Sequence, residues 1–314
     1  MTYKPLVSII ITNFNYASFL GEAIDSAINQ TYPNIEVIVV DDGSTDNSQQ
    51  IISSYGDRLV SIFKENGGHA SAFNAGFAAS TGEIICLLDS DDQFVTEKVA
   101  EIIKIFSENS TIEWCFHSLS LVEKSSGSVL ASSYNGQSRE CDFRQQMKDG
   151  KLSFLAPATS GLCFKRSLLK QILPVSEVLK LDVERYIVLV APALAKGFYL
   201  DKKLSIQGVH QNNDNTFKEG EIYDRKRAYR ASNIAYFMKK KLPEFYKIAD
   251  RTFARGLGGF WKIKPRYPEE KELIDNYFSN ATSLSKTKIY LIALYHNRPW
   301  KQRKLRKIHD KNKQ

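Results

Sequence analysis

The chain has 314 residues, of which 43% are hydrophobic and 25% charged, a composition that excludes a disordered chain and allows one or two globular domains. Its formal net charge of +8 is unevenly placed, because eight basic residues and one acid lie between Arg298 and Lys313. No apolar run reaches the roughly 18 residues of a membrane span. We expect no secretory leader either, which favours a cytoplasmic protein with reduced, buried cysteines.

Strand and helix patterns alternate along the first part of the chain. The expected strands are continuous apolar runs at residues 6–12, 35–40, 59–63, 84–88 and 114–121. The expected helices lie at residues 19–28, around Ile51, and at residues 70–79 and 97–106. Such units predict a mostly parallel α/β sheet with helices on both faces, where ligands bind beyond the carboxyl ends of the strands. The polar residues 12–15, 41–44 and 89–92 should therefore meet at one edge.

The pattern loosens after about residue 125. The sequence predicts a hairpin or loop at residues 125–139, strands at 152–165 and 198–206, and a helix at 181–196. From Glu221 on, helical patterns dominate. We expect residues 216–314 to form a helical C-terminal region that ends in the basic tail.

Three acids follow a buried strand directly, in the sequence Asp89-Ser90-Asp91-Asp92. Carboxylates packed this closely repel one another, so a stable fold needs a cation or a proton to relieve them. A second unusual segment is Asn66-Gly67-Gly68. Its glycines permit close approach of the backbone to a ligand, and it precedes a helix N-terminus, which favours anions.

Four segments, taken in order, resemble the family 2 glycosyltransferases over about residues 5–120. They are VSIIITNFN at 7–15, VVDDGSTD at 39–46, ENGG at 65–68 with NAG at 74–76, and TGEIICLLDSDD at 81–92. Members of this family are inverting enzymes of the GT-A fold. The resemblance implies a nucleotide-diphospho-sugar transferase domain at residues 1–215, with a nucleotide-binding half at 1–122 and an acceptor and catalytic half at 123–215.

The resemblance also implies a site for a nucleoside-diphosphate sugar, with a UDP-sugar as the expected donor. Asp42 can accept a hydrogen bond from a base edge, Asp41 can orient the turn or contact the ribose, and Thr12 and Asn15 offer polar groups near the base. A plain Asx turn is the alternative for residues 41–46. The expected donor contacts are Thr12, Asn13, Asn15, Asp41, Asp42, Gly43, Ser44, Asn66, Gly67, Gly68, Ala72, Asn74, Asp89 and Ser90.

Asp89 and Asp91 match the DxD pattern with which the family binds a divalent metal on the donor diphosphate. Carboxylate oxygens suit Mg²⁺ or Mn²⁺, with Asp91 as the expected direct ligand and Asp89 as its partner. Residues 204–213 resemble the family segment in which a His and an Asn close over the diphosphate. His210 is therefore a candidate metal or phosphate ligand, although Gln207-Gly208 replace the usual aromatic-Arg pair before it.

An inverting transfer needs a general base for the acceptor hydroxyl. The family supplies an acid at the start of a helix in its second half, which here matches LDVERYIVLVAP at 181–192. Glu184 stands eight residues before Pro192 and is the expected base. Because Asp is more common at this position, Asp182 remains a candidate, and an ordinary helical acid is the third interpretation.

The expected function is glycosyl transfer in cell-surface polysaccharide or glycolipid assembly, to a glycan or lipid-linked acceptor, with no nucleic acid partner. A sugar-phosphate nucleotidyltransferase is one alternative, but residues 12–15 lack the glycine-rich basic loop that it needs. A non-catalytic nucleotide-sugar or carbohydrate-binding protein is another. The apolar residues 289–295 and the basic tail after them predict a peripheral contact with the inner face of a membrane, unless that stretch packs on the catalytic domain.

Overall fold

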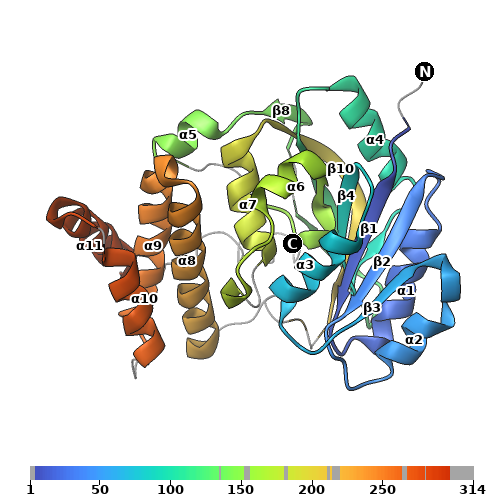
Figure 1. Ribbon diagram of the computed structural model, residues 1–314, viewed down its shortest axis with the longest axis horizontal. Helices are drawn as coiled ribbons and strands as arrows, with labels where there is room; N and C mark the ends of the chain where they lie inside the picture. The colour runs from blue at the N-terminus through green and yellow to red at the C-terminus, as the bar shows by residue number, and fades with distance from the viewer. Residues whose placement is uncertain are drawn as a thin grey trace, which may run out of the picture. The chain divides into compact units, whose positions relative to one another are not determined.

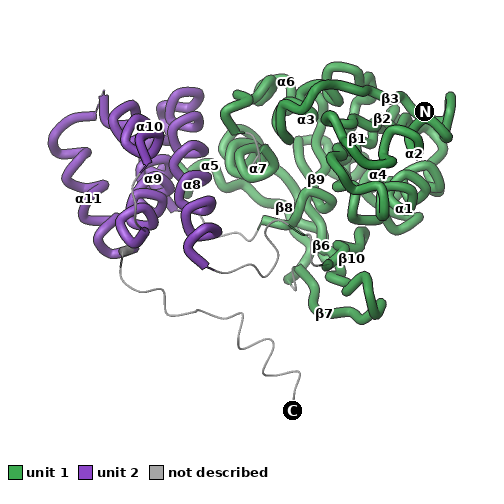
Figure 2. Tube along the Cα trace, turned by 90° about the horizontal axis from the view of Figure 1, so that it is seen from below, with its two compact units in different colours: residues 1–147, 152–216 green, residues 148–151, 217–314 purple. Residues whose placement is uncertain are grey.

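The computed structural model describes residues 4–133, 136–151, 156–179, 183–210, 213, 220–263, 267–279 and 281–297. Asp182 and the basic tail from Arg298 lie outside the described residues. The chain divides into two compact units, one of residues 1–147 and 152–216, the other of residues 148–151 and 217–314 (Figure 2).

One sheet forms the centre of the first unit (Figure 1). Its main strand order is β3-β2-β1-β4-β9-β6-β10-β5, while β7 pairs with β6 and β8 pairs with β10. The strands are β1 (Val7–Asn13), β2 (Ile35–Asp41), β3 (Val60–Phe63), β4 (Ile84–Asp89), β5 (Gln93–Phe94), β6 (Trp114–Glu123), β7 (Val129–Ser132), β8 (Arg139–Cys141), β9 (Leu162–Lys165) and β10 (Gly197–Val209).

The sheet is mixed, whereas the alternation of strands and helices predicted a mostly parallel one. The strands β1 to β4 pair in parallel, as expected. Antiparallel pairing enters through β9, which lies between β4 and β6, and through β5, which pairs with β10. Only the short turn 90–92 separates β4 from β5, and a parallel crossover needs a much longer connection. The hairpin expected at residues 125–139 is confirmed by the antiparallel pair of β6 and β7.

Helices cover both faces of this sheet (Figure 1). Successive side chains of a strand point to opposite faces, so one face of β1 and β2 packs against α1, with Ile9 and Val39 in the core, and α4 packs against β6 and β10. On the other face Ile38 and Val40 pack against Ala72 of α3. The helices of the first unit are α1 (Ala17–Ile28), α2 (Ser48–Ser54), η1 (Gly56–Arg58), α3 (His69–Ala79), α4 (Lys98–Glu108), α5 (Arg144–Lys148), η2 (Thr159–Gly161), α6 (Arg166–Ile172), η3 (Glu177–Leu179) and α7 (Val183–Leu194).

The second unit is helical. Its helices are α8 (Glu221–Lys241), η4 (Pro243–Phe245), α9 (Tyr246–Phe260), α10 (Pro268–Phe278) and α11 (Ser283–Asn297). Aromatic packing dominates its core, where the ring of Phe253 stacks on that of Tyr277 with centroids 3.6 Å apart. The described helices include none that combines the length and the apolar character needed to cross a bilayer.

The helix α11 buries only part of its apolar surface. Ile289 and Ala293 are fully buried in the core of the second unit. Five large apolar residues of the same helix are 41–65% exposed, namely Leu284, Tyr290, Leu291, Leu294 and Tyr295. The apolar stretch at residues 289–295 is therefore divided between a packed face and an exposed one.

The register of β6 and β10 depends on a glycine beside a buried tryptophan. Trp114 is fully buried, and its indole N–H donates a hydrogen bond to the carbonyl of Ala195 at 3.0 Å. Gly197 is its partner across the two strands. A Cβ atom at Gly197 would lie 1.9 Å from Cδ2 of the Trp114 ring, so no other residue fits without moving that ring.

We expect Gly197→Ala to lower the free energy of unfolding by about 3 kcal/mol, because overpacking a dense core forces side chains and backbone apart. The matched control is Gly21→Ala in α1, where the nearest atom to an added Cβ is the Tyr55 hydroxyl at 3.8 Å. That control should be neutral or stabilising by up to about 1 kcal/mol, the gain in helix propensity. Urea unfolding midpoints measure both, and equal midpoints for the two variants would contradict the packing argument.

Candidate active site

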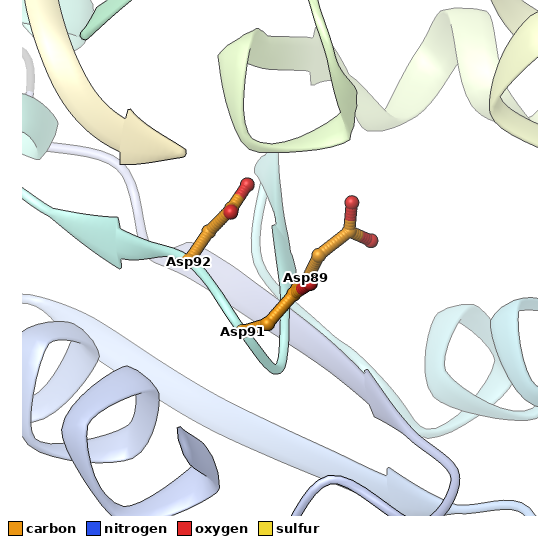
Figure 3. Close-up of side chains that lie close together, drawn as sticks. All are labelled: Asp89, Asp91 and Asp92. Carbon is orange, nitrogen blue, oxygen red and sulfur yellow. The ribbon is translucent and has the colours of Figure 1, made fainter. Parts of the chain in front are cut away.

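Three carboxylates gather where β4 ends (Figure 3). The apolar strand terminates at Asp89, and the turn after it carries Asp91 and Asp92. One oxygen from each of the three side chains lies within 4.8 Å of the others. Oxygen donors at this spacing can surround a small divalent cation, and without one their charges repel.

Asp92 is fixed in place by two hydrogen bonds and is only 2% exposed. The hydroxyl of Ser160 donates to Oδ2 at 2.6 Å, and the backbone N–H of Gly208 donates to Oδ1 at 2.9 Å. Burial, followed by the charges of Asp91 and Asp89, raises the pKa of the Asp92 carboxyl well above its usual range. With both oxygens engaged, Asp92 serves to shape the turn.

Asp89 is more exposed than Asp92 and shares Ser160 with it as a partner. Its backbone N–H donates to the Ser160 hydroxyl at 3.1 Å. Burial raises the pKa of its carboxyl to about 7, the nearby His69 opposes this shift, and the charges of Asp91 and Glu184 add to it. A carboxyl with this pKa is half protonated near neutral pH, and a bound cation would favour its ionised form.

A buried lysine contacts Ser160, the residue that hydrogen-bonds with both Asp89 and Asp92. Lys98, at the start of α4, is fully buried, and its ammonium group donates to the carbonyl of Ser160 at 2.8 Å. The same group lies 3.2 Å from the centroid of the Phe94 ring. Neither Lys98 nor Ser160 was predicted as a site residue. Lys98 precedes the buried Ile102 and Ile105 at helical spacing, which is the one signal in the sequence that it faces inward.

Asp91 is bound by the segment that follows β10. The amide nitrogen of Asn213 donates to Asp91 Oδ2 at 2.9 Å, and Nε2 of His210 lies 3.1 Å from the same oxygen. The His210 ring stacks on Phe19 with centroids 4.4 Å apart. The structure therefore places His210 beside the expected metal ligand.

At the neighbouring strand ends, Asn13 and Asp41 form a buried pair. The strand register sets Thr12 next to Asp89 on one side, and Asn13 next to Asp41 on the other. Asn13 Nδ2 donates to Asp41 Oδ2 at 2.9 Å, and the backbone N–H of Ser44 donates to Oδ1 at 2.9 Å. Asn13 Oδ1 is buried and has no hydrogen-bond partner among the described residues.

Asp42 binds the glycine-rich loop. Its carboxylate accepts hydrogen bonds from the backbone N–H groups of Gly67 at 3.0 Å and Gly68 at 2.7 Å, and from Lys64 Nζ at 2.7 Å. Three donors already engage the group that we expected at a base edge. Gly43 permits the close approach of this loop, because it has a φ of +76° and an added Cβ would lie 2.7 Å from the backbone nitrogen of Asn66.

A shallow hollow of about 480 Å³ opens beside this loop. Its lining residues are Gly43, Ser44, Gln49, Phe63, Lys64, Glu65 and Asn66, of which Gly43, Ser44 and Asn66 are expected donor contacts. Asn15 lies next to it, with its Oδ1 accepting from the backbone N–H of Thr45 at 2.7 Å.

Three further expected donor contacts are buried or engaged in packing. Ala72 is buried in the core between α3 and the sheet. The side-chain amide of Asn74 makes two hydrogen bonds with the backbone of Val175, at 2.9 and 3.0 Å. Ser90 is 4% exposed. The side chains of Ala72 and Asn74 hold α3 against the rest of the unit.

Glu184 lies in the first turn of α7 and faces the first residue of α3. Nδ1 of His69 is 3.5 Å from Glu184 Oε2, and Arg185 Nε is 3.9 Å from Oε1. Burial alone would raise the pKa of Glu184, but His69 and Arg185 outweigh it and hold the pKa below its usual value. Glu184 is therefore ionised at neutral pH, as a general base must be.

Comparison with known sequences shows which proteins this chain is similar to. The profile of the family described as "Glycosyl transferase family 2" matches residues 8–172. An uncharacterized glycosyltransferase of Nostoc is 33% identical over 213 residues, 66% of each chain, and one of Rickettsia typhi is 46% identical over 38% of each chain. The chain thus spans less than two thirds of these relatives' lengths. The chondroitin synthase of Pasteurella multocida is 39% identical over 42% of this chain and 14% of its own.

Solved structures share the fold at low sequence identity. Staphylococcus aureus TarS 1–349 in complex with UDP aligns with a TM-score of 0.63 at 18% identity, over 93% of this chain and 88% of its own. The mannosyltransferase PcManGT of Pyrobaculum calidifontis aligns with a TM-score of 0.51 at 18% identity, over 94% and 88%. Because the family profile covers more than half of the chain and the fold agrees, this chain is a glycosyltransferase of family 2 with the GT-A fold.

Proposed function

We propose that the chain transfers a sugar from a nucleoside diphosphate to an acceptor hydroxyl with inversion, assisted by Mg²⁺ or Mn²⁺ at Asp89 and Asp91. The observation that carries this proposal is that the acidic cluster and the ionised Glu184 belong to one unit and interact. The charge of Glu184 acts on Asp89, and His69 acts on both of these acids. Metal-held donor phosphates and a separate base are the two parts that such a transfer needs.

The donor would lie along the edge formed by the ends of β1, β2 and β4. Thr12 and Asn15, which reach the surface, can contact the nucleotide at this edge, and the buried Asn13 lies between them in the sequence and fixes the edge through Asp41. Asp41 and Asp42 would act by fixing Asn13 and the glycine-rich loop, since their oxygens are engaged there. The TarS complexes with UDP and UDP-GlcNAc support a nucleotide-sugar donor, with a UDP-sugar as our first choice.

The acidic cluster fits a divalent cation. Asp89 and Asp91 offer hard oxygen atoms at suitable spacing, and a positive charge would oppose the effects of burial and of the neighbouring carboxylates, which raise the Asp89 pKa. His210 is the third proposed ligand, from its place beside Asp91. A bound cation would stabilise the charge that develops on the departing diphosphate. PcManGT, whose structure contains GDP-Man and Mn²⁺, supports this choice.

Glu184 is our proposed base, and its role is to take the proton from the acceptor hydroxyl. Its side chain is 17% exposed, so one edge can meet an acceptor while the other faces His69. A low pKa makes it a weak base in the ground state, but keeps it deprotonated over the physiological range. Asp182 lies outside the described residues and remains the alternative.

The first prediction concerns the metal. In Asp91→Asn the direct carboxylate ligand is lost, and we expect the Mn²⁺-dependent affinity for UDP to fall by at least about 10-fold. Isothermal titration of UDP, GDP and dTDP sugars, with Mn²⁺ or with EDTA, measures this. Asp57→Asn, at an exposed acid in η1, is the matched control and should bind as the parent does. Equal affinity with EDTA and with Mn²⁺ in the parent protein would disprove the metal assignment.

The second prediction concerns the base. Glu184→Gln should reduce the release of nucleoside diphosphate by at least about 100-fold, while donor affinity stays within about threefold, since the base acts on the acceptor. Hydrolysis of the best donor in the titration provides the assay, because water then takes the place of the acceptor hydroxyl. The control is Glu177→Gln at an exposed acid of η3. If Asp182→Asn stops turnover and Glu184→Gln does not, the base is Asp182.

We also propose that the acceptor is a glycan or lipid-linked glycan at the inner face of a membrane, and that α11 contacts this surface. The support is the exposed apolar face of Leu284, Leu291, Leu294 and Tyr295, and the excess of basic residues that follows α11 in the sequence. Apolar side chains and clustered cations are the two elements of peripheral binding to anionic lipid.

The third prediction tests that contact by flotation with anionic phosphatidylglycerol vesicles at low salt. The full chain should float, and Leu291→Ser with Leu294→Ser should weaken its vesicle affinity by at least about 10-fold, because two leucines no longer enter the lipid. The control is Val178→Ser, which removes an apolar side chain that is 55% exposed in the first unit. Failure of the parent chain to bind even at low salt, where attraction is strongest, would refute the membrane contact.

A further inference from the structure

His69 stands at the junction of the glycine-rich loop and the helix α3. It is the first residue of α3, and Gly68, with a φ of +85°, directly precedes it. The backbone N–H groups of Gly67 and Gly68 both donate to Asp42. The position of His69 is therefore set by the same carboxylate that fixes the loop at the donor edge.

The His69 side chain points to the acidic groups of the site. Its Nδ1 lies 3.5 Å from Glu184 Oε2, and the two side chains are 22% and 17% exposed. The charge of His69 also acts on Asp89, where it opposes the rise in pKa that burial causes. The second neighbour of Glu184 is Arg185, whose side chain is 55% exposed and approaches the other oxygen at 3.9 Å. Of these two partners, His69 is the shielded one, so water weakens its interaction with Glu184 less.

We infer that His69 is a positioning residue that orients the Glu184 carboxylate toward the acceptor and connects this carboxylate to the donor loop. The inference rests on the proposed role of Glu184 as the base. The approach of Nδ1 to one oxygen at 3.5 Å restricts rotation of the carboxylate and directs its other lone pairs away from α3. Because His69 adjoins the loop that Asp42 holds, a shift of the loop moves the group that orients the base.

The test compares two substitutions of His69. In His69→Leu the donor to Glu184 is lost, and we expect kcat for donor hydrolysis to fall about 10–100-fold with the Kd for UDP and Mn²⁺ within about threefold. In His69→Asn the amide nitrogen occupies nearly the position of Nδ1, and kcat should stay within about fivefold of the parent. If His69→Leu does not fold, His69→Ala serves the same purpose.

The Glu184→Gln background separates this inference from the proposed function. If His69 acts through Glu184, adding His69→Leu to Glu184→Gln should cause no further loss of kcat. A multiplicative loss in the double variant, a parent-like kcat in His69→Leu, or an equal loss in His69→Asn would overturn the inference and leave Glu184 as the base. Full turnover in Glu184→Gln alone would overturn the proposed base, and the role of His69 with it.

Discussion

Three carboxylates are crowded at the end of one buried strand, and the contacts that hold them determine much of the packing of the first unit. Burying like charges is costly unless donors or a cation compensate them. The fold supplies donors to Asp92 from Ser160 and from the backbone of Gly208, and it places the ammonium group of Lys98 behind Ser160. These groups come from η2, β10 and α4, so the second half of the sheet is needed to keep the acids of the first half in place.

The antiparallel part of the sheet has the same explanation. With β9 between β4 and β6, the residues just before it, including Ser160, reach the end of β4. With β5 paired to β10, the turn 90–92 is held against Gly208 and the segment that carries His210 and Asn213. A purely parallel sheet would leave the turn without these partners. The departure from the expected topology thus produces the geometry of the acidic cluster.

A second network runs along the edge where β1 and β2 end. Asp41 binds Asn13 and the Ser44 backbone, while Asp42 binds the loop that begins α3. These two acids shape the edge through protein contacts, and Asn13 Oδ1 remains buried there without a hydrogen-bond partner among the described residues. Charge-assisted bonds to backbone N–H groups are strong, so Asp42 holds the loop before α3 firmly in place.

The sequence by itself determined the apolar strands β1, β2 and β4, the helices between them, and the family, because these depend on periodicity and on motifs within a few residues. It also indicated that polar residues after parallel strands share one edge, as the pairing of Asn13 with Asp41 and of Thr12 with Asp89 shows. It did not reveal that Asp42 is engaged by Lys64 and two glycines, that Lys98 is buried, or that His69 faces Glu184. Those contacts join residues far apart in the chain, and only the tertiary structure decides which side chains then share a buried space and which charges must compensate one another.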